Sequence, residues 1–537
     1  MAHKRALFQA AAQEKIHRGA AKLADAVRIT LGPKSKCVLI QKSWGTPLVC
    51  NDGVTIAKEF DLEDAEENLG TQMLRQAAER TGDAVGDGTS TATILAYRIF
   101  AEGLRNVAAG ASAVDLRRGL ERGTTAAIGA LRSLSRPVQS RREKAQVATI
   151  SAHNDEVIGR LVADAIERVG GEGIVTVEEA KTTETTVDVV EGMQFDKGFV
   201  SPYFITDRDK VEAVLEEPRI LITDRKISLA ADLVPVLESV AKQGRPILII
   251  ADNVEGDALA TLIVNKLRGI LSVAAAKAPG YGDRRKDMLE DIATLTGGTV
   301  ISDDLGVKLD QAKPEMLGTA SRVILNGEST TIVGGGGSKK ALHDREMQVR
   351  RQIEKSTSEY DKEKLRERLA RLSGGVAVIR VGAPSEAEMR NRKEAFEDAV
   401  SSTKAAVAEG IVPGGGLALL RMIPAVEKLE AEATGDELTG LRILKRAMEE
   451  PVRQIAENSG ADPGVVAHRM RTGTGSEGFD ASRNTWVDLV AEGIIDATKV
   501  IRIALENAVS VAGVLLLTQA TLTEVPEKKS RPEPAVE

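Results

Sequence analysis

The chain has 537 residues, of which 42% are hydrophobic and 28% are charged, and its net charge is −7. This length exceeds what one hydrophobic core organises, so we expect about three domains of ordinary size. The acidic balance offers no electrostatic surface for nucleic acid or anionic lipid, which argues against either as a partner.

The numbers and positions of the cysteines, histidines and apolar residues argue against a disulfide scaffold, a metal site and a membrane segment. Cys37 and Cys50 are too few for a disulfide scaffold, and we expect both to pack as small strand residues rather than to act in redox chemistry. The five histidines lack the spacing of metal ligands. The N-terminus has no apolar signal core, and the late apolar run from Val514 to Leu517 is too short to cross a bilayer. We therefore expect a cytoplasmic protein without a membrane anchor.

The N-terminal segment predicts a helix followed by a hairpin. Apolar residues recur at helical spacing over 6–29, and Leu31-Gly32-Pro33 ends that helix. Short strands are predicted at 38–40 and 48–50, and the turn Asn51-Asp52-Gly53 displays a carboxylate.

Two long helices are predicted next, over about 65–84 and 89–108, and they are joined by Gly86-Asp87-Gly88-Thr89-Ser90-Thr91. The N–H groups and dipole at the start of a helix favour phosphate, and the glycines let the backbone approach it closely. Asp87 is a hard oxygen ligand suited to Mg²⁺. From these residues alone, an ordinary glycine turn with a capped helix has equal weight.

The middle of the chain changes pattern after Arg136. Strand-like segments run from 173 to about 190, and a further domain extends from about 191 to 373. In that domain strands such as 247–250 alternate with helices such as 257–267, which indicates an α/β layer arrangement.

The last third begins with the charged stretch 338–372, for which we favour a solvated helix with i,i+4 ion pairs over a charge-recognition site. A strand at 376–379 and a long helix carrying Asp398 follow. Gly414-Gly415-Gly416 opens a final helical region, and the polar tail from Pro526 is predicted to be disordered.

One glycine-rich segment is rejected as a nucleotide site. The run 473–478, Gly-Thr-Gly-Ser-Glu-Gly, matches the spacing of a dinucleotide-binding loop, but it follows a polar segment rather than a strand and precedes no clear helix. The chain also has no Gly-Lys pair for a Walker A loop, so any phosphate site here is not that of a P-loop NTPase.

Several motifs together resemble the group I chaperonins, the GroEL family, over almost the whole chain to about residue 525. They occur in the family's order and spacing: Leu31-Gly32-Pro33, Asn51-Asp52-Gly53, Gly86 to Thr91, Ala278-Pro279-Gly280-Tyr281-Gly282-Asp283-Arg284-Arg285 and Gly414-Gly415-Gly416. The resemblance implies the multidomain α/β chaperonin fold, which is α+β in its overall make-up. It implies a mostly helical equatorial ATPase domain (1–135 and 411–537), a small α/β intermediate hinge domain (136–190 and 374–410) and an α/β apical domain (191–373).

The resemblance also implies an ATP site with Mg²⁺ and K⁺. Its nucleotide-binding positions are Thr30, Leu31, Gly32, Pro33, Asn51, Asp87, Gly88, Thr89, Ser90, Thr91, Gly415, Asp480, Ala481, Ile494 and Asp496. Asp87 would hold Mg²⁺, and Thr30, Asn51 and Ser90 would hold K⁺. Asp52 and Asp398 match the carboxylates near the γ-phosphate, although Asp398 taken alone is better interpreted as a surface acid on a helix.

Four aromatic residues fall between 195 and 204, in a chain that is only 3% aromatic. Taken alone, Phe195, Phe199, Tyr203 and Phe204 favour a local core. The resemblance instead implies an exposed surface that binds non-native polypeptides and the co-chaperonin. Its residues are Phe199, Tyr203, Phe204, Val234, Leu237, Leu259, Ile263 and Val264.

The function implied is that of an ATP-dependent chaperone, a homo-oligomer of two stacked seven-membered rings that acts on unfolded polypeptides with a GroES-type co-chaperonin. Asn51 and Ser90 depart from the family's usual lysine and threonine, and the tail lacks the family's Gly-Gly-Met repeats. Two rival functions stay open. One is a ring scaffold that has lost productive cycling, which Asp52, Asp87 and Asp398 argue against, and the other is a small-molecule kinase, for which no second substrate site is suggested.

Overall fold

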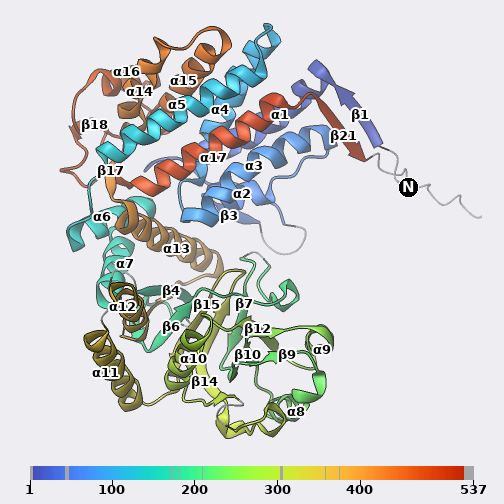
Figure 1. Ribbon diagram of the computed structural model, residues 1–537. Helices are drawn as coiled ribbons and strands as arrows, with labels where there is room; N and C mark the ends of the chain where they lie inside the picture. The colour runs from blue at the N-terminus through green and yellow to red at the C-terminus, as the bar shows by residue number, and fades with distance from the viewer. Residues whose placement is uncertain are drawn as a thin grey trace, which may run out of the picture. The chain divides into compact units, whose positions relative to one another are not determined.

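The computed structural model divides the chain into two compact units (Figure 1). The first contains 1–164, 179–184 and 381–537, and the second contains 165–178 and 185–380. The predicted mixture of helices and sheets is confirmed, whereas the division into three domains stays a prediction. The structure describes residues 4–42, 47–170, 173–180, 182–208, 210–302, 306–356, 358–373 and 375–524.

Helices form the core of the first unit. Their bounds are α1 Gln9–Arg28, α2 Gly53–Glu59, α3 Ala65–Val85, α4 Thr89–Ala108, α5 Ala113–Leu134, α6 Arg141–Ser151, α7 Glu156–Val169 (which continues into the second unit), α13 Glu386–Glu409, α14 Leu417–Glu430, α15 Gly435–Ser459, α16 Pro463–Thr472 and α17 Thr498–Leu517. Gly19 of α1 and Gly70 of α3 have no room for a Cβ, which would lie 1.7 Å and 2.0 Å from the facing carbonyl oxygens. This close crossing places α1 directly against α3, the helix that leads into the Gly86 turn.

Short antiparallel strand pairs complete the first unit. They are β1 Lys4–Phe8 with β21 Ala520–Glu524, β2 Val38–Ile40 with β3 Leu48–Cys50, β17 Ile411–Pro413 with β20 Ile495–Ala497, and β18 Glu477–Asp480 with β19 Thr485–Asp488. The last two pairs flank a candidate site described below.

Helix α17 is the one helix among the described residues that is long and apolar enough to cross a bilayer, with a mean hydropathy of 1.9 over 18 residues. It is longer than the apolar run recognised in the sequence. In the structure 61% of that stretch is buried, and α17 packs against α3, α4 and α5. The apolar surface of α17 is therefore explained by its place in the core of the unit.

The second unit is built on an eight-stranded mixed sheet. Its main path is β12 (Val273–Lys277), β10 (Ile247–Ala251), β8 (Arg219–Thr223), β14 (Gly318–Leu325), β15 (Thr330–Gly335) and β6 (Gly192–Phe195), with β13 (Val300–Ile301) on β8 and β7 (Ala213–Glu216) on β14. The helices of this unit are α8 Val234–Lys242, α9 Gly256–Leu267, α10 Asp283–Thr296, α11 Lys339–Lys355 and α12 Glu359–Ser373. A three-stranded sheet has the order β4 (Ile174–Glu179), β16 (Val376–Val381), β5 (Thr186–Val190). This alternation of strands and helices confirms the predicted α/β arrangement.

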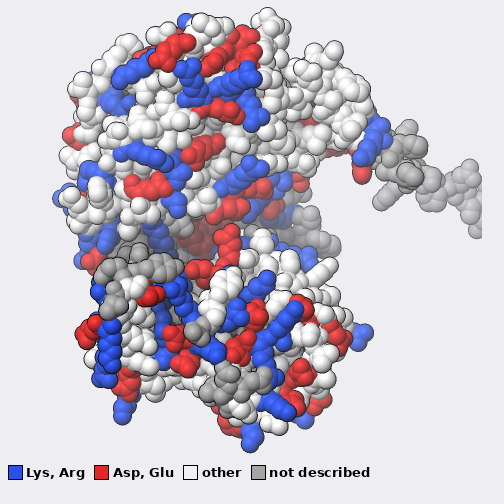
Figure 2. Space-filling model, in the orientation of Figure 1, with Lys and Arg blue, Asp and Glu red and all other residues white. Residues whose placement is uncertain are grey.

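The charged stretch 338–372 differs from its prediction. It forms two helices, α11 and α12, and Arg345 and Arg368 bind Asp291 of α10, which is 1% exposed. Two of the charged residues thus form a buried ion cluster that joins α10, α11 and α12, rather than solvated i,i+4 pairs. On the face drawn in Figure 2, basic and acidic side chains are interspersed.

Three local predictions were wrong, and one lies outside the described residues. Residues 6–8 belong to strand β1, because they pair with β21 at the far end of the chain, and the final region therefore ends in a strand rather than a helix. Cys37 is exposed and lies outside β2. Cys50 packs in β3 as predicted, and burial raises the pKa of its thiol to about 12. The tail from Pro526 lies outside the described residues.

Candidate functional site

A pocket of about 500 Å³ in the first unit gathers every predicted nucleotide position, together with Asp52 and Asp398. Its volume lies within the range of small-molecule sites. The lining comes from the turn after α1, the β3–α2 turn, the α3–α4 turn, α6 and the start of α7, α13, the start of α14, α15 and the segment from β18 to α17. Segments far apart in the sequence therefore meet at one cavity, and their role with a nucleotide stays a prediction.

The α3–α4 turn has the geometry of an anion site. Gly86 and Gly88 have left-handed backbone angles, with φ of 69° and 79°, and Gly88 is the N-cap of α4. No side chain caps α4, so the hydroxyls of the first turn do not occupy its leading N–H groups. The alternative of a side-chain-capped turn is thus not what the structure contains, and the helix start is left to an anion or water.

Asp87 and Asp52 are both held by hydrogen bonds. Asp87 Oδ1 accepts from the N–H of Gly88 at 2.5 Å, and Oδ2 accepts from Ser151 Oγ at 2.7 Å. Asp52 caps α2 by accepting from the N–H groups of Val54 (3.3 Å) and Thr55 (2.7 Å). Each carboxylate is therefore fixed in direction before any ligand arrives.

Two further carboxyls have raised pKa values. Burial raises the pKa of Asp398 well above its ordinary value, and the charges of Asp52 and Asp87 raise it further. Burial, followed by the charge of Asp87, raises the pKa of Asp496 to about 7. Carboxyls that hold protons for lack of a counter-charge fit a cation-dependent ligand, because a cation would favour their ionised forms.

The donor set also fits magnesium delivered with a phosphate ligand. No group of three or more acidic, histidine or cysteine side chains among the described residues could hold a metal unaided. Mg²⁺ commonly uses one or two carboxylates and completes its shell with phosphate oxygens and water. Asp87 beside the open start of α4 is such a position.

Two of the three predicted K⁺ positions contact each other. Thr30 Oγ1 lies 2.9 Å from Ser90 Oγ and donates to the carbonyl oxygen of Val27 at 2.8 Å. Asn51 lines the same pocket. The three side chains therefore offer oxygen atoms to one cavity, and their role with K⁺ stays a prediction.

The opposite side of the pocket is built from glycine backbone and a buried acid. Gly415 has φ of 61°, and Gly416, with φ of 79°, is the N-cap of α14. Asp480 is 4% exposed, and its Oδ1 accepts from the N–H groups of Ser482 (2.8 Å) and Arg483 (3.2 Å). This side presents carboxylate oxygen and backbone groups, the acceptors and donors that a nucleoside requires.

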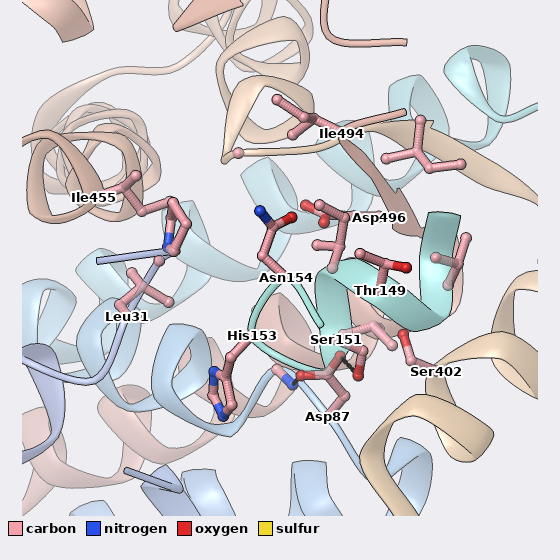
Figure 3. Close-up of a pocket in the computed structure, with 18 of the residues that line it drawn as sticks. Leu31, Asp87, Thr149, Ser151, His153, Asn154, Ser402, Ile455, Ile494 and Asp496 are labelled. Atoms are coloured by element: carbon pink, nitrogen blue, oxygen red, sulfur yellow. Dashed lines mark hydrogen bonds between the residues drawn. The ribbon is translucent and has the colours of Figure 1, made fainter. Parts of the chain in front are cut away.

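The end of α6 supplies pocket residues that the sequence did not indicate. Thr149, Ser151, His153 and Asn154 line the cavity, and Figure 3 shows Ser151 beside Asp87 with His153 and Asn154 on the following turn. His153 and Asn154 both have left-handed backbone angles, with φ of 52° and 72°. The tolerance of such residues for this conformation was the one available signal, and it is weak.

The predicted polypeptide-binding surface is only partly exposed. Tyr203, Val234 and Val264 are 64%, 42% and 43% exposed, and Phe199, Leu237, Leu259 and Ile263 are half-buried. The expected exposure of Phe204 is wrong, because its side chain is fully buried in the core of the second unit, as Phe195 is. Leu267 and Ile270, which are not among the predicted residues, are 69% and 61% exposed at the end of α9.

Comparison with known proteins identifies the family of the chain. The TCP-1/cpn60 chaperonin family model matches residues 23–526. The chain is 68% identical over 536 residues to "Chaperonin GroEL 5" of Bradyrhizobium diazoefficiens, covering 99% of both chains. The chain therefore belongs to the TCP-1/cpn60 chaperonin family and is an ATP-dependent chaperone of protein folding.

Proposed function

We propose that the pocket of the first unit binds and hydrolyses ATP, and that hydrolysis times the capture and release of non-native polypeptides by the second unit. The observation that carries this proposal is the meeting of an uncapped helix start with Asp52, Asp87 and Asp398 in one cavity. The phosphates would lie at the start of α4, and the nucleoside would lie between Gly415 and Asp480.

The side chains divide the chemistry among them. Magnesium, when bound with the nucleotide, neutralises charge on the transferred phosphoryl group. Asp87 would hold the metal, with its direction set by the Gly88 N–H and the Ser151 hydroxyl. Asp52, fixed by two backbone N–H groups, would orient the attacking water. Burial and neighbouring carboxylates raise the pKa of Asp398, and a bound cation would favour its ionised form, which would accept the proton of that water.

The exposed apolar side chains of the second unit would bind the client. Tyr203, Val234 and Val264 expose apolar side-chain surface to solvent, which suits unfolded segments of varied sequence. We further propose a homo-oligomer of two stacked seven-membered rings, in which many weak sites hold one client at once. A GroES-type co-chaperonin would cap the ring, K⁺ would assist at Thr30, Asn51 and Ser90, and the protein would act in the cytoplasm.

A refolding assay tests the proposal. A chemically denatured client is diluted into the protein with Mg-ATP, with and without a co-chaperonin, while phosphate release is followed in parallel. We expect phosphate release and client recovery in the wild type, and loss of both in Asp87→Ala or after magnesium is removed by chelation. The control is Asp83→Asn, an exposed acid near the end of α3, the helix that precedes the Asp87 turn. Full refolding without phosphate release would contradict the proposal.

A further inference from the structure

An ion pair lies at the solvent-exposed rim of the nucleoside side of the pocket. Arg483 and Glu492 both line the cavity, and their side chains are 65% and 44% exposed. Arg483 Nη1 donates to Glu492 Oε2 at 2.9 Å. The pair thus links the turn that follows β18 to the loop that precedes β20, two segments that both contribute to the pocket wall.

The arginine is anchored to the buried acid of the site. Its backbone N–H donates to Asp480 Oδ1 at 3.2 Å, and its Nη1 lies 3.8 Å from Asp480 Oδ2. Asn484, with φ of 54°, makes the tight turn that leads into β19. Lys34, the residue after Pro33, donates to the Asn484 side chain at 3.2 Å and so ties this turn to a third segment of the wall.

The glutamate is held by an equally defined loop. Its backbone N–H donates to the carbonyl oxygen of Asp488 at 3.0 Å. Two residues later, the N–H of Ile494 donates to the carbonyl oxygen of Leu489 at 2.7 Å, and Ile494 itself faces the pocket (Figure 3). Arg483 thus contacts Asp480 directly, and Glu492 lies two residues before Ile494 in a loop that backbone hydrogen bonds hold.

We propose that the Arg483–Glu492 ion pair is a clasp that closes the nucleoside side of the pocket and sets the rate of nucleotide exchange. The inference rests on the function proposed above, in which this cavity holds an adenine nucleotide. An exposed pair opens easily, because solvent screens its attraction. A pair that bridges two segments of the rim must open for entry and for exit alike, so it slows both steps and leaves the dissociation constant nearly unchanged.

Changed binding and release rates at a constant dissociation constant distinguish a clasp from the two other roles that an arginine at this rim could have. A direct contact with nucleotide phosphate would change the dissociation constant. A surface pair without function would change no rate. The chain offers a matched pair for the latter case: Arg118 and Asp115 of α5 are 2.9 Å apart and 68% and 43% exposed, and neither lines the pocket.

The test compares full-length wild type with Arg483→Glu, Glu492→Arg, the double charge swap and the control Arg118→Glu. Protein loaded with radiolabelled Mg-ADP is chased with unlabelled ADP to give the release rate, and binding rate and affinity are measured on the same samples. We expect each single variant to bind and release ADP about threefold to tenfold faster, the upper end reflecting added repulsion. The swap should return to within about twofold of wild type, and the control should match it.

Each outcome decides the inference. Faster exchange at constant affinity, reversed by the charge swap, supports the clasp. A release rate that rises with salt concentration in the wild type but not in Arg483→Glu also supports it. Unchanged release in both single variants overturns the clasp and leaves ATP binding intact. Weaker affinity with an unchanged binding rate makes Arg483 a nucleotide contact and also overturns it. If wild type retains no ADP at all, the proposed function fails and the clasp fails with it.

Discussion

The pocket of the first unit and the exposed apolar side chains of the second, the two proposed recognition surfaces, have opposite physical character. The pocket of the first unit is built from backbone N–H groups and carboxylates whose directions are fixed by hydrogen bonds, such as Asp87 and Asp52. The surface of the second unit consists of apolar side chains that stand free in solvent, such as Tyr203 and Leu267. One surface suits a single small anion, and the other suits chains of many sequences.

This contrast predicts that substitutions in the pocket and on the apolar surface differ in the size and the specificity of their effects. In the pocket, removal of one atom disturbs a network in which every partner has a set place, so effects should be large and confined to nucleotide chemistry. On the apolar surface, several neighbouring side chains would contact the client together. The effect of a single substitution should therefore be smaller, and it should depend on the charge of the new side chain more than on its shape.

The largest effect is expected from Asp398→Ala. Loss of the proton acceptor should reduce ATP hydrolysis by about 100-fold or more while ATP still binds, because the phosphate-holding turn is untouched. Single-turnover hydrolysis and equilibrium ATP binding measure the two quantities. The control is Glu386→Gln at the start of the same helix, which is 83% exposed and should hydrolyse ATP at the wild-type rate. Wild-type turnover in Asp398→Ala would remove this residue from the mechanism.

Phe204→Ala comes next and tests the correction made by the structure. Because the ring is fully buried, truncation should destabilise the second unit by about 3–5 kcal/mol. The adjacent Tyr203→Ala should cost less than about 0.5 kcal/mol, because its ring is 64% exposed. Denaturant unfolding of both variants measures the difference. Equal stability of the two would mean that Phe204 is a surface residue after all.

A charge placed on the apolar surface should have an intermediate effect. Val264→Glu, or Leu267→Glu at the missed end of α9, should weaken capture of an unfolded client by about tenfold, since a carboxylate must lose its water to enter an apolar contact. ATP hydrolysis should not change. The control is Val114→Glu on α5, which is 51% exposed and belongs to the other unit. Equal loss of capture in all three variants would point to a general effect of charge.

The same contrast explains how much could be predicted from the sequence. The pocket was predictable where glycine and aspartate mark special backbone, as at Gly86 to Thr91, because such turns have few sequence solutions. Ser151 was not predictable, since it acts only through a contact with Asp87 that tertiary folding creates.

Apolar patterns were less informative than glycine patterns. Phe204 in the core and Tyr203 on the surface are adjacent aromatic residues, and only tertiary packing against the core of the second unit distinguishes them. Strand β1 was read as part of a helix for a related reason. Its partner β21 lies at the far end of the chain, and no local pattern reports that pairing.

The smallest expected effect concerns Asp496 and reverses the usual behaviour of an acid. Its ordinary pKa of 3.8 is raised to about 7 in the folded chain, so between these values the folded state holds a proton that the unfolded state has released. Folding is then favoured at lower pH, and stability is lost as the pH rises through about 7. Between pH 6 and 7 the loss should be about 1 kcal/mol or less, because solvent reaches the pocket.

Thermal unfolding of the nucleotide-free protein at pH 6 and pH 7 measures this effect. Asp496→Asn cannot ionise and should flatten the dependence on pH, whereas Asp25→Asn, an exposed acid on α1, should keep the wild-type slope. Mg-ADP should also flatten the wild-type slope, because a bound cation favours the ionised carboxylate. A slope that survives in Asp496→Asn would place the titrating group elsewhere in the pocket, with Asp398 as the next candidate because its pKa is also raised. A slope that disappears in Asp496→Asn would show that the folded pocket disfavours a negative charge at this residue until a ligand that carries a cation binds.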